Sequence, residues 1–140
     1  MPGASILLAE DDLAFRDTVE DALADEGHRI TTARNGAEAL VALDRLPRPA
    51  LILLDLHMPV MDGVSFLNAL RLRPDRDEFE VVIMTARVDI EWFHQAEGVI
   101  RAMKKPFELS EIVEVTREFA RRRPATSARG AAGGERARRP

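Results

Sequence analysis

The segment PALILLDLHMPVMDG, Pro49 to Gly63, decides the fold of this 140-residue chain. It opens with an unbroken apolar run, Ala50–Leu54, which is typical of an interior strand of a parallel sheet. The run stops at Asp55, and the Met-Pro and Asp-Gly pairs behind it are turn signals. A lone acid at such a point usually marks only the exit of a strand from the core. Its meaning therefore depends on the residues that the fold brings beside it.

Four more apolar runs predict strands, and helical spacing of apolar residues predicts the segments between them. The predicted strands are Ser5–Ala9, His28–Ala33, Ala50–Leu54, Val81–Thr85 and Val99–Met103. The predicted helices lie in residues 12–27, 35–47, 62–74, 89–98 and 108–123. Strand and helix alternate throughout, which indicates an α/β fold with a mostly parallel sheet and helices on both faces. The second strand carries polar residues, as an edge strand does.

Charge is divided unevenly along the chain. The net charge is −4, but residues 121–140 hold seven Arg and one Glu, so they carry +6 and the first 120 residues carry −10. An acidic body argues against nucleic acid as the main ligand of the fold. The tail is rich in Ala, Gly and Arg and has no apolar periodicity, so it cannot bury a core. We therefore predict one folded domain over residues 5–121 and a flexible basic tail over 122–140.

Composition and the N-terminal sequence exclude several classes of protein. The chain has no Cys, which excludes disulfides and Cys-ligated metal sites. The N-terminus has no basic region ahead of its short apolar run, so it does not resemble a signal peptide. No run approaches the roughly 18 apolar residues of a membrane span. We expect a cytoplasmic protein.

Polar groups follow four of the five predicted strands, at the edge where open parallel sheets bind ligands. They are Glu10, Asp11 and Asp12 after the first strand, Asp55 after the third, Thr85 at the end of the fourth, and Lys104 and Lys105 after the fifth. Crowded carboxylates repel each other, and a hard cation such as Mg²⁺ relieves that repulsion. A lysine can pair with a carboxylate or a phosphoryl oxygen. The set predicts a phosphoryl-transfer site in which the Asp55 carboxylate is the nucleophile.

Each of these residues also has a plain structural explanation when it is taken alone. The acids at 10–12 can cap the first helix and interact with its dipole. Thr85 can be an ordinary strand end, and Lys105 a solvated loop residue. Their joint occurrence at four strand ends is what favours a site.

The motifs LLAEDD, DLHMPVMDG, MTA and KKPF resemble, in order and spacing, the receiver domain of bacterial two-component response regulators. The resemblance covers about residues 5–121. It implies a flavodoxin-like, doubly wound sheet of five parallel strands in the order 2-1-3-4-5. It also implies a phospho-aspartyl signalling module of a phosphorelay. Such a module accepts a phosphoryl group from a histidine kinase or phosphotransfer protein and then switches protein–protein binding. It is not a turnover enzyme, although it assists its own Mg²⁺-dependent phosphorylation and dephosphorylation.

The resemblance assigns a role to each matching position. Asp55 is the phospho-acceptor, Asp11 a direct Mg²⁺ ligand, Glu10 its neighbour acting through water, and the His57 backbone carbonyl a further ligand. Thr85 corresponds to the switch hydroxyl, and Lys105, before Pro106, to the lysine that reaches the phosphate. Asp12 remains a third acid beside the pair.

Two departures from the family pattern affect the switch. Ala102 stands where the fifth strand usually carries an aromatic residue, and the interval from Thr85 to Lys105 is shorter than the resemblance implies. The output face is expected on the helix at 89–98, the strand Val99–Met103 and the helix at 108–123. We expect the signal to be concentrated in residues 86–97, where Trp92 and Phe93 offer either a partner surface or simple packing.

Three alternatives stay open at this point. A phosphatase with an aspartyl nucleophile would need Asp-x-Asp after the first strand, and this chain has Glu-Asp-Asp there. The arginine-rich tail could bind nucleic acid as an accessory role. The chain could also be a stand-alone receiver or a receiver cut from a larger regulator.

Overall fold

The structure, a computed structural model, describes residues 3–86 and 96–123. They form a five-stranded parallel sheet in the order β2-β1-β3-β4-β5, which confirms the predicted fold and strand order. The strands are β1 (Ser5–Ala9), β2 (Arg29–Ala33), β3 (Ala50–Asp55), β4 (Phe79–Thr85) and β5 (Val99–Lys104). The main change from prediction is that β4 begins two residues earlier, at Phe79, and β3 includes Asp55.

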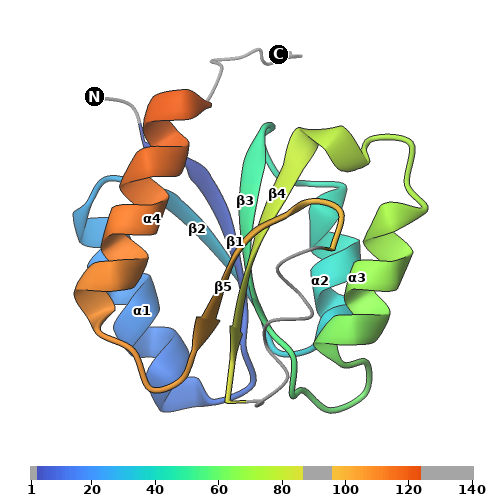
Figure 1. Ribbon diagram of the computed structural model, residues 1–140, viewed down its shortest axis with the longest axis horizontal. Helices are drawn as coiled ribbons and strands as arrows, with labels where there is room; N and C mark the ends of the chain where they lie inside the picture. The colour runs from blue at the N-terminus through green and yellow to red at the C-terminus, as the bar shows by residue number, and fades with distance from the viewer. Residues whose placement is uncertain (1–2, 87–95, 124–140) are drawn as a thin grey trace.

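Within the described residues, four helices lie in two layers against the sheet. They are α1 (Leu13–Asp25), α2 (Gly36–Leu43), α3 (Gly63–Arg71) and α4 (Leu109–Arg122), and a short 3-10 turn, Arg76–Glu78, precedes β4. In Figure 1, α1 and α4 cover one face of the sheet, and α2 and α3 cover the other. The 3-10 turn was not predicted from the sequence.

The central strands are buried on both faces because each face has its own helical layer. Successive side chains of a strand point to opposite faces, so Leu51 and Leu53 pack with α1 and α4, whereas Ile52 and Leu54 pack with α2 and α3. All four are fully buried. This explains the unbroken apolar run at the start of the segment that decides the fold.

Side-chain caps start three of the helices at the carboxyl edge of the sheet, which is the lower edge in Figure 1. Asp12, Asn35 and Asp62 each accept a hydrogen bond from the backbone N–H three residues later. Asn35, the first residue of the segment predicted as a helix over 35–47, is thus the N-cap of α2. The chain therefore enters α1, α2 and α3 at the edge where β1, β2 and β3 end.

Several predictions fall outside the described residues. They are residues 89–95 of the helix predicted at 89–98, with Trp92 and Phe93, and nearly all of the basic tail. The last three residues of that predicted helix, 96–98, form a bend and a turn. The domain limits at residues 5 and 121 stay predictions. Within residues 3–86 and 96–123, no helix is both long and apolar enough to cross a membrane.

Candidate functional site

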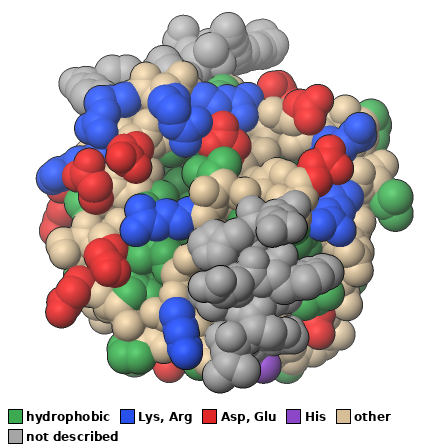
Figure 2. Space-filling model, viewed as in Figure 1, with side chains coloured by type: hydrophobic (Ala, Val, Ile, Leu, Met, Phe, Trp, Pro, Cys, Tyr) green, Lys and Arg blue, Asp and Glu red, His purple; other side chains and the backbone are tan. Residues whose placement is uncertain are grey.

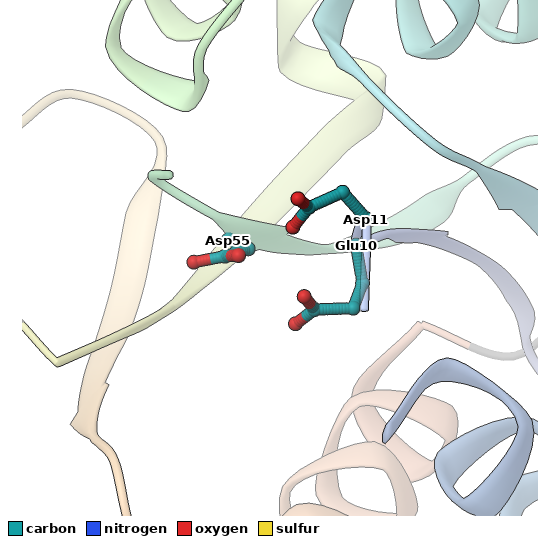
Figure 3. A group of neighbouring side chains, drawn as sticks. All are labelled: Glu10, Asp11 and Asp55. Carbon is teal, nitrogen blue, oxygen red and sulfur yellow. The ribbon is translucent and has the colours of Figure 1, made fainter. Parts of the chain in front are cut away.

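The ends of β1 and β3 bring two acids together inside the protein. The parallel register pairs Ala9 of β1 with Leu54 of β3. The residues that follow them in the chain, Glu10 and Asp55, therefore lie side by side. Glu10 is 1% exposed and Asp55 5% exposed. Figure 3 shows the Glu10 and Asp11 side chains extending from the end of β1 towards Asp55. The acid that ends the buried strand therefore does not simply leave the core.

Three carboxylates form a cluster at this edge. One oxygen from each of Glu10, Asp11 and Asp55 lies within 4.8 Å of the other two, and Asp11 is the exposed member. Carboxylate oxygens in such a set suit a hard divalent cation that keeps several of its waters. The exposed Asp11 leaves the cluster open to solvent on one side. These residues fit Mg²⁺ in number, spacing and donor type.

Lys105 reaches this cluster from the turn after β5. Its Nζ donates to Glu10 Oε1 at 2.8 Å and lies 3.9 Å from Asp55 Oδ2. Its backbone N–H donates to the Thr85 carbonyl at 2.7 Å, which ties the turn to the end of β4. One ammonium thus faces two buried carboxylates, and it is closer to Glu10 than to Asp55.

Burial makes this arrangement electrostatically unfavourable for the two acids. Removal from water raises the pKa of Glu10 to about 7, against the lowering effect of its hydrogen bond to Lys105. Burial also raises the pKa of Asp55, and the nearby Lys105 charge only partly opposes it. One lysine therefore does not compensate two buried carboxylates. A bound dication would supply the missing positive charge.

Asp12 has a different task from its two neighbours. Its Oδ1 accepts from the Phe15 N–H at 3.1 Å, which makes Asp12 the N-cap of α1. Its own N–H donates to Glu10 Oε2 at 3.1 Å. The capping explanation thus applies to Asp12, whereas the side chains of Glu10 and Asp11 point into the cluster.

The remaining candidate residues lie around Asp55. The His57 N–H lies 3.3 Å from Asp55 Oδ1, and the His57 side chain is exposed. Thr85 is fully buried at the end of β4, in the position next to that paired with Asp55, since Asp55 pairs with Met84. The roles assigned to the His57 carbonyl and the Thr85 hydroxyl remain predictions.

Comparison with known proteins agrees with this geometry. Residues 6–117 match the family described as the response regulator receiver domain. The chain belongs to this family. It is a receiver domain of the kind used in two-component signalling.

Two relatives show how much of a longer protein this receiver spans. It is 29% identical over 121 residues to sporulation initiation phosphotransferase F of Bacillus subtilis, covering 85% of this chain and 95% of that protein. It is 36% identical over 124 residues to the transcriptional regulatory protein PrrA of Mycobacterium leprae, covering 87% of this chain and 52% of that protein. The receiver thus spans nearly all of the first and about half of the second.

Solved structures share the fold. The chemotaxis response regulator CheY4 of Vibrio cholerae is similar with a TM-score of 0.73 and 25% identity, over 83% of this chain and 98% of that one. The response regulator TrrA of Thermotoga maritima, in complex with Mg²⁺ and BeF, is similar with a TM-score of 0.69 and 25% identity, over 81% and 96%.

Three residues near the receiver site were given no role by sequence reasoning. Phe15 lies with its ring centroid 4.5 Å from Lys105 Nζ, and Phe107 packs edge-on against Phe15. Arg16 donates from Nη1 to the Glu10 carbonyl at 2.9 Å. Phe15 shows in the sequence only as part of the apolar stripe of α1, and nothing in the sequence distinguishes Arg16 from a solvated helix residue.

The loop from β3 to α3 is packed tightly behind Asp55. A Cβ placed on Gly63 would come within 2.5 Å of the Asp55 carbonyl oxygen and 2.8 Å of Leu56 Cα, so glycine is required by this close approach. Val60, at the tip of the loop, has φ of 69° and is 86% exposed. A β-branched residue in the left-handed region is strained, which indicates that the loop is held by its surroundings.

Proposed function

We propose that Asp55 accepts a phosphoryl group and that this chain is a phospho-aspartyl switch in a two-component phosphorelay. The observation that carries the proposal is the buried Asp55 carboxylate beside Glu10 and Lys105, at the end of the central strand. A carboxylate beside an ammonium and further acids suits a nucleophile that attacks the phosphorus atom of an incoming phosphodonor. Membership in the receiver family supports the same role.

The reaction exchanges one bond to phosphorus for another. An Asp55 oxygen forms a bond to phosphorus as the bond to the donor breaks, and the leaving group takes the electron pair. With acetyl phosphate the leaving group is acetate, and with a phosphohistidine donor it is the imidazole. Lys105 offers an ammonium to the phosphoryl oxygens, because its present partner Glu10 lies beside Asp55.

We assign the metal to the same cluster. Asp11 and Asp55 would hold Mg²⁺ directly, Glu10 would act through a bound water, and the His57 backbone carbonyl would add an oxygen ligand. Bound Mg²⁺ would neutralise charge on the phosphoryl group and on the carboxylates. The complex of the similar TrrA with Mg²⁺ and BeF supports this assignment.

The partners follow from the chemistry. The donor would be a histidine kinase or a histidine phosphotransfer protein, and the output would be a change in the affinity for a downstream protein. In this role the chain assists its own phosphorylation and hydrolysis but does not turn over a separate substrate. The similarity to a phosphotransferase and to a transcriptional regulator supports a place in such a relay.

The output step would differ from the usual one because of Ala102. This residue lies on β5 opposite Ile83 and packs against the core, where a methyl group has no rotamer to change. We therefore expect Thr85 and Lys105 to respond directly and the signal to pass through residues 86–97. Amide hydrogen exchange with and without beryllofluoride tests this, and changes centred on β5 alone would contradict it.

The test of the main proposal is direct phosphorylation. The full chain, incubated with acetyl phosphate and Mg²⁺, should gain the mass of one phosphoryl group, and chelation of Mg²⁺ should prevent the gain. Peptide mapping after borohydride trapping should place the group on Asp55. Labelling that is independent of Mg²⁺, or that maps to another residue, would refute the proposal.

A further inference from the structure

An aromatic ring lies directly beside the ammonium of Lys105. The distance from Lys105 Nζ to the Phe15 ring centroid is 4.5 Å, which is within the range of a cation–π interaction. Phe15 is on the first turn of α1 and packs against the core shared by α1 and α4. The Lys105 side chain is 24% exposed, so the ring replaces part of its water. Such an interaction is stronger where the cation is partly desolvated.

The ring is held by contacts that do not involve Lys105. The Phe15 N–H donates to the capping oxygen Asp12 Oδ1 at 3.1 Å, which fixes the backbone beneath the side chain. The ring of Phe107 meets the ring of Phe15 at an interplanar angle of 81°, with centroids 5.9 Å apart. This edge-to-face geometry is a favoured one for aromatic pairs. The Phe15 ring is therefore held in place independently of Lys105, and it restricts the position of the flexible lysine side chain.

Lys105 needs such a constraint because its two acids compete for it. The ammonium is 2.8 Å from Glu10 Oε1 and 3.9 Å from Asp55 Oδ2. A hydrogen bond to Glu10 is directional and would hold the ammonium away from Asp55. The attraction to a ring face has no single preferred donor direction. The ammonium can therefore turn from Glu10 towards Asp55 and keep its contact with the ring.

We propose that Phe15 is a positioning residue whose ring keeps the Lys105 ammonium above the gap between Glu10 and Asp55, ready for the phosphoryl group. The inference rests on the proposed function, since it assumes that Lys105 meets the phosphoryl group on Asp55. Phe15 touches no reacting atom and acts through Lys105. If the ring served only to fill space, the rate of phosphorylation would not depend on the negative charge of its face.

Stepwise fluorination separates these two roles, because it weakens the negative face of the ring and changes its shape little. Mono-, di- and trifluorinated phenylalanine would be incorporated at position 15 of the full chain. The rate of phosphorylation by acetyl phosphate at saturating Mg²⁺ should fall with each added fluorine, by roughly three- to thirtyfold across the series. The matched control is the same series at Phe66, a buried ring on the other side of the sheet, which should leave the rate unchanged. A flat series at position 15 would overturn the inference.

A spectroscopic measurement checks the geometry without using activity. A lysine methylene over a ring face has proton signals moved upfield, so the Lys105 Hε signals should be moved upfield in the native chain. They should return towards ordinary values in Phe15→Leu, which keeps an apolar side chain. Ordinary Lys105 Hε shifts in the native chain would overturn the inference.

Parallel variants distinguish failure of this inference from failure of the proposed function. If Asp55→Asn is still labelled, the proposed function fails. If Asp55→Asn blocks labelling and Lys105→Met slows it, but fluorination has no effect, only the role of Phe15 fails. In a Lys105→Met background, fluorination should no longer change the rate. An undiminished effect there would show that the ring acts through packing and would also overturn the inference.

Discussion

The two edges of this sheet handle charge in opposite ways. At the amino edge, acids are paired with guanidinium groups: Asp75 meets Arg48 at 2.6 Å and Arg73 at 2.9 Å, and Arg73 also meets Asp44 at 2.8 Å. Figure 2 shows positive and negative side chains interspersed across the upper part of the molecule, over this edge. At the carboxyl edge, Glu10 and Asp55 are buried and, among the residues that the structure describes, share the ammonium of Lys105.

The pKa values reflect this difference. The hydrogen bonds to Arg73, and the charge of Arg48, hold the pKa of Asp75 below its usual value. Burial raises the pKa of both Glu10 and Asp55 above theirs. The same type of side chain thus stabilises the fold at one edge and costs stability at the other. An uncompensated cluster is tolerated where a ligand is to supply the missing charge.

The largest expected effect is on phosphoryl labelling, when one acid at each edge is replaced by its amide. Asp55→Asn should abolish Mg²⁺-dependent labelling by acetyl phosphate, because the amide lacks the nucleophilic oxygen. Asp75→Asn, the same chemical change at the amino edge, should leave labelling intact. Intact mass spectrometry measures both. Labelling of Asp55→Asn, or its loss in Asp75→Asn, would break the distinction between the edges.

At the carboxyl edge, substitution of the adjacent acids Asp11 and Asp12 should have different effects. Asp11→Ala should weaken Mg²⁺ binding roughly tenfold or more, since a charged ligand is lost outright. Asp12→Ala should leave Mg²⁺ binding largely unchanged and lower the free energy of unfolding by about 1 kcal/mol, because it removes the cap of α1. Calorimetric Mg²⁺ titration and urea denaturation of both variants measure the two effects. Equal losses of Mg²⁺ affinity would mean that the two roles are assigned wrongly.

Replacing a carboxylate with an amide should change stability with opposite sign at the two edges. The pKa of Glu10 is raised from 4.5 to about 7, so the folded protein holds a proton there that the unfolded chain releases. Stability therefore declines as pH rises through this window. In metal-free buffer, Glu10→Gln should be similar to the native chain near pH 5 and more stable at pH 8, by roughly 1–3 kcal/mol.

Asp75→Asn is the matched control for that measurement. The pKa of Asp75 is lowered, so its contribution is present above its usual pKa and is lost as pH falls through the lowered value. At pH 8 the variant should be less stable than the native chain, by about 1 kcal/mol for a partly exposed ion pair. Chemical denaturation at both pH values decides the sign. Destabilisation by Glu10→Gln at pH 8 would show that the carboxyl edge is already compensated.

The smallest expected effect concerns His28, at the amino end of β2. Its Nδ1 accepts from the Ala4 N–H at 2.9 Å, and burial lowers its pKa, against the charge of Glu26 and together with that of Arg117. Because the folded state disfavours the protonated ring, stability should fall as pH drops below the usual value of 6.5. The loss should be about 1 kcal/mol, close to one hydrogen bond. His28→Gln should lack this part of the pH dependence in thermal denaturation, and an unchanged profile would exclude His28 as its source.

Most of the fold was predictable because its signals are local. The interior strands β1, β3 and β4 are apolar on both faces, and Asn35 and Gly27 mark helix ends by their own chemistry. The 3-10 turn at Arg76–Glu78 was missed, since it lies between Pro74 and β4 and carries no apolar periodicity. The early start of β4 depends on pairing with β3, which the sequence of β4 does not show by itself.

The site was predictable only in part. The polar residues at the strand ends follow from topology, and the resemblance to receivers assigns their roles. The different tasks of Asp11 and Asp12 could not be read from a run of acids, because they depend on which side chain turns back to the Phe15 N–H. The position of Phe15 beside Lys105 depends on how two segments far apart in the sequence pack together, so only the folded structure shows it.

Gly63 has a consequence for how this protein can vary by mutation. The start of α3 lies so close to the Asp55 carbonyl that even one methyl group at position 63 would overlap it. A change from glycine to alanine would alter no charge and remove no hydrogen-bonding side chain, yet it would push on the peptide of Asp55, the proposed phospho-acceptor. An inherited defect in signalling could thus arise at a residue with no side chain and no chemistry of its own.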